Sequence, residues 1–308
     1  MNKQLIDLHL HTSSSDGKLN TSQVIEEAEK AGMSVISITD HNTVNAYDTL
    51  RECRHLFSGK IVTGAELSTS YQGELLEILC YGIDIEYIKK FISQNYLSFR
   101  EKTLTDRLVI LKQYRKKGVV MSDEFCYNME HHPEKYYQPD KESCRGAFLN
   151  EIVRHPENAE FFGGKQQMDE VTIRTYLRNH YGCPSSKLYV DMSSVFPSFE
   201  TLVNAVHEAG GLAFMAHCFL YSKNITDNLH KIAKKYKLDG FECYHSHFTK
   251  EQSEYLCNLC DKNNMYKSGG SDFHGGTRTD CILGKSTGGI SLDSSLANDW
   301  LKGLNNYV

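Results

Sequence analysis

The stretch Asp7-Leu8-His9-Leu10-His11-Thr12-Ser13-Ser14-Ser15-Asp16-Gly17 places two histidines and a carboxylate just after an apolar run. That run, Leu5-Ile6, predicts a short buried strand. His9 and His11 are two positions apart, so in a strand both imidazoles project from one face, and imidazole is a common metal ligand. Asp16 lies on a Ser-rich loop and is close enough in sequence to fold back beside them. The alternative explanation of the pair is structural: one histidine makes its hydrogen bonds within the protein and the other is exposed to solvent.

Composition is typical of a soluble globular protein, with 308 residues, 40% hydrophobic and 24% charged. The length allows one large domain or one domain with an insert. The net charge of −5 predicts no extended nucleic-acid surface, and no apolar run is as long as a membrane span. Because the first strand begins almost at Met1, we expect no signal peptide and a cytoplasmic location.

The 10 cysteines are scattered without the spacing of a disulfide framework, so reduced thiols are expected. Cys257 and Cys260 form the one close pair, in a segment, 250–263, that has helix character. No second pair accompanies them, which makes the motif a weak indication of a zinc or redox site.

Strand and helix patterns alternate along both ends of the chain, which is typical of a parallel α/β architecture. The predicted strands are 5–6, 34–39, 60–66, 212–216 and 238–244, with further strand-like runs at 75–83 and 265–270. The predicted helices are 21–31, 45–56, 199–209, 226–237 and 250–263. Between the two ends, residues 91–187 predict a mostly helical insert, so residues 1–90 and 188–308 are expected to form one domain.

Potential metal ligands follow the C-terminal ends of these strands, the edge that carries the active site in barrel-type α/β folds. They are His9, His11, Asp16, His41, Glu66, His217, Asp272 and His274. Imidazole and carboxylate ligands suit Zn, Mn or Fe, and one tetrahedral ion takes only about four. We therefore expect two or three clustered divalent ions, an arrangement suited to phosphate-ester hydrolysis.

The ordered set of motifs resembles the PHP (polymerase and histidinol phosphatase) superfamily. The matching segments are Asp7-Leu8-His9-Leu10-His11-Thr12, Thr39-Asp40-His41-Asn42, Gly64-Ala65-Glu66, Ala216-His217 and Gly270-Ser271-Asp272-Phe273-His274-Gly275. The resemblance implies a distorted seven-stranded, TIM-like (β/α) barrel with a trinuclear metal site at its C-terminal edge. The middle segment also looks like the insert of PHP phosphoesterases that act on nucleotides.

The same resemblance implies a grouping of the ligands into metal sites. The first site would hold His9, His11, Glu66 and Asp272; the second would share Glu66 and add His217 and one further ligand; the third would hold Asp16, His41 and His274. A hydroxide bridging the ions would attack phosphorus. His217, His245 and His247 are candidates for a role near the leaving group, and the sequence does not separate metal ligand from general acid.

Glu77 marks a first departure from the family pattern. The further ligand of the second site is usually a histidine before a Leu-Gly-Tyr stretch, and Leu76-Glu77-Ile78-Leu79-Cys80-Tyr81 places a glutamate there. Glutamate is a harder ligand than imidazole and suits Mn or Fe. The expectation is a site with a changed metal preference or an empty one; an exposed strand residue is the third explanation.

Two further departures concern phosphate recognition. The related enzymes carry an Arg-x-His in the insert that grips substrate phosphate, and Arg145-Gly146-Ala147 keeps only the arginine. Arg145 is therefore predicted to bind phosphate through its two-pronged guanidinium, with a structural ion pair as the alternative. The family's Ala-His-Pro reads Ala216-His217-Cys218 with no arginine close behind, so phosphate recognition is expected to differ from that of the nucleotide-hydrolysing relatives.

The leading prediction is a metal-dependent phosphoesterase that acts on a small phosphomonoester or a nucleotide. The alternatives are a histidinol phosphatase, an exonuclease of short oligonucleotides, and a metal-binding module whose activity is impaired by the changes at Glu77 and Ala147. The expected partner is a small phosphorylated substrate, with no membrane; the oligomeric state is left open.

Overall fold

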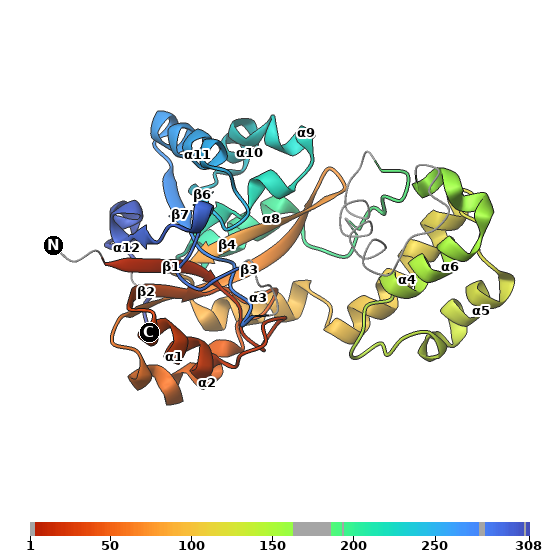
Figure 1. The fold of residues 1–308 in the computed structure, drawn as a ribbon, viewed down its shortest axis with the longest axis horizontal. Helices are drawn as coiled ribbons and strands as arrows, with labels where there is room; N and C mark the ends of the chain where they lie inside the picture. The colour runs from red at the N-terminus through yellow and green to blue at the C-terminus, as the bar shows by residue number, and fades with distance from the viewer. Residues whose placement is uncertain (1–3, 163–185, 193, 277–280, 305) are drawn as a thin grey trace. The chain divides into compact units, whose positions relative to one another are not determined.

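The structure, a computed structural model, describes residues 4–162, 186–192, 194–276, 281–304 and 306–308 (Figure 1). The chain forms two compact units: unit 1 comprises Met1–Thr69, Leu76–Gln94 and Ser198–Val308, and unit 2 comprises Ser70–Leu75 and Asn95–Pro197. The domain organisation expected from the sequence, with an insert at 91–187, stays a prediction. Residues 163–185 of that insert lie outside the described residues.

Unit 1 contains an eight-stranded sheet that closes almost completely into a barrel. The strand order is β7-β6-β5-β4-β3-β2-β1-β8, and the strands are β1 (Leu5–Leu10), β2 (Met33–Ile38), β3 (Lys60–Tyr71), β4 (Glu74–Tyr81), β5 (Leu212–Met215), β6 (Gly240–Tyr244), β7 (Tyr266–Gly269) and β8 (Leu292–Asp293). A parallel bridge between Leu10 and Phe273 joins the end of β1 to the segment that follows β7. The expected TIM-like barrel is thereby confirmed, with the two-residue β8 as an addition.

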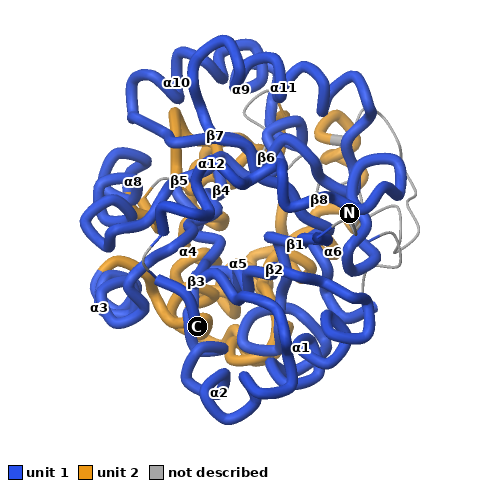
Figure 2. The backbone as a smooth tube through the Cα atoms, turned by 90° about the vertical axis from the view of Figure 1, so that its left-hand side faces the viewer, with its two compact units in different colours: residues 1–69, 76–94, 198–308 blue, residues 70–75, 95–197 orange. Residues whose placement is uncertain are grey.

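Helices surround the ring of strands in unit 1 (Figure 2). They are α1 (Thr21–Lys30), α2 (Ala46–Cys53), α3 (Ile85–Asn95), α8 (Phe199–Glu208), α9 (Lys223–Thr226), α10 (Leu229–Tyr236), α11 (Lys250–Asn263) and α12 (Asn298–Leu301), with short 3₁₀ helices η1 (Arg54–Leu56), η4 (Cys218–Leu220), η5 (Thr287–Gly289) and η6 (Ser294–Leu296). Side-chain capping defines where two of these helices begin. Asn20 caps the N-terminus of α1 and Thr249 caps that of α11, each in a reciprocal capping box.

The strand β4 runs antiparallel to β5, which differs from the all-parallel pattern expected from the sequence. The reason is a tight turn after β3 at Gln72 and Gly73, which have φ angles of 51° and 84°. This left-handed backbone reverses the chain within two residues, so no crossover helix is needed. Glu77 consequently lies on the only strand of β1–β7 whose direction is reversed within this sheet.

An aromatic cluster fills part of the apolar core of unit 1. Tyr81 stacks on Trp300 with ring centroids 5.2 Å apart and meets the edge of Phe214 at 5.1 Å. The Tyr81 hydroxyl donates to the Leu8 carbonyl at 3.0 Å, and the Trp300 indole nitrogen donates to the Lys267 carbonyl at 2.9 Å. The cluster therefore ties β1, β4, β5, β7 and α12 together with its polar atoms satisfied.

Unit 2 is mostly helical among its described residues. It contains α4 (Phe99–Lys116), α5 (Asp123–His131), α6 (Arg145–Arg154), η2 (Pro133–Lys135) and η3 (Pro156–Phe162). Its own core includes Tyr114, Phe125 and Phe148, whose rings pack edge to face. A separate core of this kind indicates that the unit packs around its own apolar side chains.

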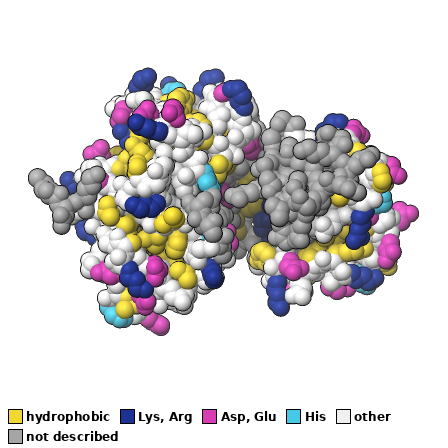
Figure 3. Space-filling view, viewed as in Figure 1, with side chains coloured by type: hydrophobic (Ala, Val, Ile, Leu, Met, Phe, Trp, Pro, Cys, Tyr) yellow, Lys and Arg dark blue, Asp and Glu magenta, His cyan; other side chains and the backbone are white. Residues whose placement is uncertain are grey.

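None of the described helices is long and apolar enough to span a membrane. On the face of the molecule drawn in Figure 3, Lys and Arg side chains alternate with Asp and Glu over the part of the chain that the structure describes. That face presents no continuous basic stripe among the described side chains, in line with the small net negative charge.

Replacing Trp300 by alanine is expected to lower the free energy of unfolding by about 3–5 kcal/mol, because a large buried aromatic leaves a cavity when it is removed. Trp300 is 2% exposed. Because Trp300 is the single tryptophan, the variant has no tryptophan fluorescence. Its unfolding in urea should therefore be followed by circular dichroism. The exposed Ile290 provides the control: Ile290→Ala should change stability by less than about 0.5 kcal/mol. Equal midpoints for the two variants would contradict the assignment of Trp300 to the core.

Candidate metal centre

All of the predicted metal ligands lie in unit 1, and the structure brings them together. His9 lies in β1 and His11 directly after it, both buried, because the alternation of the strand points them to the same side. His41 follows β2, and an isolated parallel bridge pairs it with Glu66 in the middle of β3. The ligands therefore come from neighbouring strands.

His9, His11 and Asp272 form a first group around the carboxylate of Glu66. The Oδ1 atom of Asp272 lies 3.4 Å from His9 Nε2 and 3.1 Å from His11 Nε2. Glu66 Oε2 lies 3.2 Å and 3.4 Å from the same two nitrogens. These are the residues that the resemblance assigns to the first metal site, and their ligand atoms converge on one point.

Glu77 belongs to a second group, with Glu66, His41 and His217. Its Oε2 lies 3.3 Å from His217 Nε2 and its Oε1 lies 3.3 Å from His41 Nδ1. Glu66 Oε1 is 2.8 Å from the same His217 nitrogen. The backbone N–H of Glu77 donates to the Tyr221 hydroxyl at 2.9 Å. Glu77 is thus directed into the cluster and is not an exposed strand residue.

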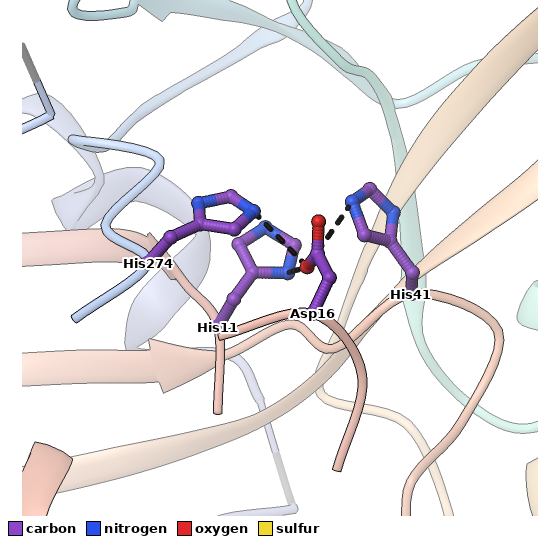
Figure 4. A group of neighbouring side chains, drawn as sticks. All are labelled: His11, Asp16, His41 and His274. Carbon is purple, nitrogen blue, oxygen red and sulfur yellow. Dashed lines mark ion pairs between the residues drawn. The ribbon is translucent and has the colours of Figure 1, made fainter. Parts of the chain in front are cut away.

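The third group surrounds the carboxylate of Asp16, as Figure 4 shows. Asp16 Oδ1 lies 3.1 Å from His274 Nε2, 3.8 Å from His41 Nε2 and 3.8 Å from His11 Nδ1. The sequence predicts Asp16, His41 and His274 here, and the structure adds His11. The two ring nitrogens of His11 consequently face two different groups, Nε2 the first and Nδ1 the third.

The charges of the site follow from burial and from this close packing. Burial disfavours the protonated form of His41, but Glu66 and Glu77 outweigh it and raise the pKa of His41 to about 10. Burial and the charge on His41 lower the pKa of His11 to about 4. Burial and Glu66 act to raise the pKa of Glu77, but His41 and His217 outweigh them and lower it to about 2. Ionised carboxylates thus surround a neutral His11, whereas His41 carries a proton that it would have to release in order to bind a metal ion.

The donor set fits divalent cations. Among the described residues, His217 Nδ1 and both ring nitrogens of His11 are buried and make no hydrogen bond. Buried polar atoms are nearly always satisfied, so such atoms call for an explanation. Imidazoles with this many carboxylates suit Mn, Fe or Zn, and the residues in place can hold more than one ion.

Glu242 is a buried site residue that the sequence prediction did not include. Its Oε1 accepts a hydrogen bond from His9 Nδ1 at 2.8 Å, and its Oε2 accepts one from the His217 backbone N–H at 2.7 Å. Because Glu242 holds the proton on His9 Nδ1, Nε2, which faces Glu66 and Asp272, would be the nitrogen that binds a metal ion. The signal available in the sequence was a lone charged residue inside the apolar strand β6.

Two further buried carboxylates hold the backbone around the ligands. Asp40 accepts hydrogen bonds from the Thr12 N–H at 2.7 Å, the Thr12 hydroxyl at 2.6 Å and the Ser15 hydroxyl at 2.6 Å, which fixes the loop that carries Asp16. Asp7 accepts from the Ser271 N–H at 2.9 Å, next to the ligand Asp272.

The backbone itself is strained at the ligands. His217 and Asp272 have φ angles of 22° and 57°, and Asn42, beside His41, has 52°. Positive φ is costly for residues other than glycine, and such strain gathers at functional sites. The hydrogen bond from the His217 N–H to Glu242 helps to hold one of these conformations.

The remaining predicted site residues have different surroundings. His245 is fully buried, with Nε2 3.4 Å from Asp272 Oδ2 and its ring 5.6 Å from that of His217. His247 is exposed, with its ring 5.2 Å from that of His245. Arg145 is the first residue of α6, in unit 2, and is half-buried.

Comparison with known proteins identifies relatives of this chain. The chain is 24% identical over 273 residues, 87% of this chain and 89% of the relative, to a 5'-3' exoribonuclease of Haemophilus influenzae. It is 24% identical, over 87% of both chains, to a 3',5'-nucleoside bisphosphate phosphatase of Chromobacterium violaceum.

The fold is also that of a solved structure from Chromobacterium violaceum, described as an amidohydrolase with bound sulfate and no metal. The TM-score is 0.60 at 21% identity, covering 92% of both chains. The PHP domain family matches residues 7–161. The resemblance found in the sequence is confirmed, and the chain belongs to the PHP-domain family.

Proposed function

We propose that this protein is a metal-dependent hydrolase of phosphate esters, acting on a small phosphomonoester or a nucleotide. The observation that carries the proposal is the convergence of His9, His11, Asp272 and the other ligands on Glu66 at one edge of the barrel. Two or three divalent ions held there would supply a bridging hydroxide as nucleophile and would polarise the phosphoryl oxygens.

We assign the other side chains of the site separate roles in binding metal, orienting ligands and donating a proton. Glu66 faces both of the first two groups and offers one carboxylate to both. Glu242 fixes the orientation of His9 and the backbone of His217. His245 is buried, and burial lowers its pKa, so we assign it a neutral, orienting role beside Asp272. The exposed His247 is our candidate for the donor to the leaving group.

The class of substrate that we propose, a phosphate ester, follows from the chemistry that the relatives share. The relatives differ in their substrates, but an exoribonuclease and a nucleoside bisphosphate phosphatase both cleave phosphate esters. Arg145, predicted from the sequence to bind phosphate through its two-pronged guanidinium, lies in unit 2, and this role stays a prediction. The similarity to the exoribonuclease makes cleavage of short oligonucleotides the second candidate function.

Hydrolysis is expected to require a divalent metal and to fall by at least about 100-fold in Asp272→Ala. Loss of even a hydrogen-bond partner of a metal ligand lowers metal affinity or activity by about 10–100-fold, and loss of a ligand should cost more. The assay measures phosphate or nucleotide release with Mn²⁺, Fe²⁺ or Zn²⁺, before and after chelation. Asp227→Ala is the matched control, because Asp227 is exposed and its carboxylate pairs with Lys223 at 2.7 Å.

The same assay separates the candidate substrates. A nucleoside bisphosphate, histidinol phosphate and a short 5'-phosphorylated RNA should be compared by kcat/KM, with the products of the RNA resolved by length. Full activity in Asp272→Ala would overturn its role as a ligand. Bound metal without turnover of any ester would instead favour the impaired metal-binding module.

Glu77→His is expected to change which metal the protein retains. Imidazole is a softer ligand than carboxylate, so the variant should retain a higher ratio of Zn to Mn than the wild-type protein. Both proteins are incubated with equal concentrations of the two ions, desalted and measured by elemental analysis. Glu77→Gln is the control for loss of charge without a new imidazole. An unchanged ratio in all three proteins would show that Glu77 does not bind metal.

Glu242→Gln is expected to weaken metal binding by about 10–100-fold, the usual effect of losing a partner of a metal-binding histidine. The amide keeps the shape of the carboxylate but has one acceptor oxygen, so it cannot accept from both His9 and His217. Affinity is measured by titration calorimetry. Glu254→Gln, on the exposed face of α11, should bind as the wild type does. Wild-type affinity in Glu242→Gln would contradict the assigned role.

A further inference from the structure

Cysteine side chains gather in unit 1 between β6 and α11, where they are not among the metal ligands. Cys257 and Cys260 are three positions apart in α11, so they lie on the same face of the helix. Cys243 in β6 meets this face: its Sγ lies 3.7 Å from Sγ of Cys260, and Cys257 is near enough for the Cys243 thiol to shift its pKa. The third thiol comes from a distant strand, which the spacing of the Cys-x-x-Cys pair does not show.

The thiols differ in access to solvent. Cys243 and Cys260 are buried, whereas Cys257 is half-buried and is the most accessible cysteine among the described residues. The Cys260 thiol donates to the Tyr266 carbonyl at 3.3 Å. A reagent from solvent therefore reaches Cys257 first, with Cys243 behind it.

The surroundings of Cys257 favour its thiolate. The hydrogen bond from Cys243 lowers the pKa of Cys257, burial opposes it, and Tyr244 and Lys267 add to the lowering, with a result of about 7. Burial raises the pKa of Cys243 well above its usual value, so its thiol keeps its proton. The Lys267 ammonium is held in place by Asp261 at 2.6 Å. The thiol of Cys257 is thus suited to react, and the thiol of Cys243 is suited to stabilise the thiolate by donating a hydrogen bond.

We propose that Cys257 is a modification site for hydroperoxides and that Cys243 resolves the product as an intrachain disulfide. The sulfur of Cys257 attacks the O–O bond of the hydroperoxide, giving a sulfenic acid and releasing the alcohol, or water from hydrogen peroxide. The Cys243 sulfur then attacks the sulfenic acid; the S–S bond forms as the S–O bond breaks, and water leaves with the thiol proton. The peroxide gains two electrons and the two thiols lose them.

The geometry supports closure of this bond with small movements. A disulfide requires sulfur atoms about 2.05 Å apart and Cα atoms about 4.4–6.8 Å apart. Cys243 already contacts the thiol of Cys260, which shares a helix face with Cys257, and β6 and α11 pack directly on each other. The 3.7 Å between the sulfurs of Cys243 and Cys260 brings the β6 thiol within about 2 Å of bonding distance to the cysteine face of α11.

The full chain should be titrated with hydrogen peroxide, alkylated, digested without reductant and analysed by mass spectrometry. The expected product is a linked peptide pair joining Cys243 and Cys257, about 2 Da lighter than the two thiols and restored by dithiothreitol. In Cys243→Ser, the sulfenic acid of Cys257 should persist and be trapped by dimedone. The alkylation rate of Cys257 should rise with pH around an apparent pKa near 7.

Variants identify the reacting pair. Cys257→Ser should abolish the linkage, whereas Cys53→Ser, a buried cysteine of α2, should leave it unchanged. Lys267→Gln should slow alkylation of Cys257, because it removes the neighbouring positive charge. The proposal would be overturned if the linkage persisted in Cys257→Ser. It would also be overturned if the wild-type protein formed no disulfide before its cysteines were irreversibly oxidised. These measurements need no phosphoesterase activity and are therefore independent of the proposed function.

Discussion

The rest of the site depends on the carboxylate of Glu66, which is fully buried and shared by the imidazoles around it. Oε1 lies 2.8 Å from His217 Nε2, while Oε2 lies 3.1 Å from His41 Nδ1 and 3.2 Å from His9 Nε2. Burial acts to raise the pKa of this carboxyl, but His41, His9 and His217 outweigh it and hold the pKa well below its usual value. A buried charge of this kind persists only with such close compensation.

Three further buried carboxylates support the segments that carry this concentration of charge. Asp40, Asp7 and Glu242 all accept hydrogen bonds from backbone N–H groups of the segments that carry ligands. Each therefore positions a ligand through the main chain. The same hydrogen bonds help to stabilise the positive φ angles found at His217 and Asp272. The barrel supplies the strands, and these buried carboxylates set the local direction of the chain.

Much of the fold and the ligand set could be predicted because it follows from local patterns. The two-residue period of a strand places His9 and His11 on one side, and strand ends meet at one edge of the sheet. The reversed direction of β4 was not predicted, since it depends on the left-handed turn at Gln72 and Gly73. The role of Glu242 also was not predicted, because a single buried carboxylate gives no sequence period. Its partners, His9 and the His217 backbone, are distant in the chain and meet only in the fold.

Alternation along β6 links the two faces of the barrel wall. Glu242 contacts His9 on the inner side, while the next residue, Cys243, contacts the sulfur of Cys260 on α11. Adjacent residues of a strand are joined by one planar peptide unit, so a change in the β6 backbone at Cys243 also acts on Glu242. If the proposed disulfide formed, a resulting change in the β6 backbone would therefore reach the imidazole of His9 through a single peptide unit.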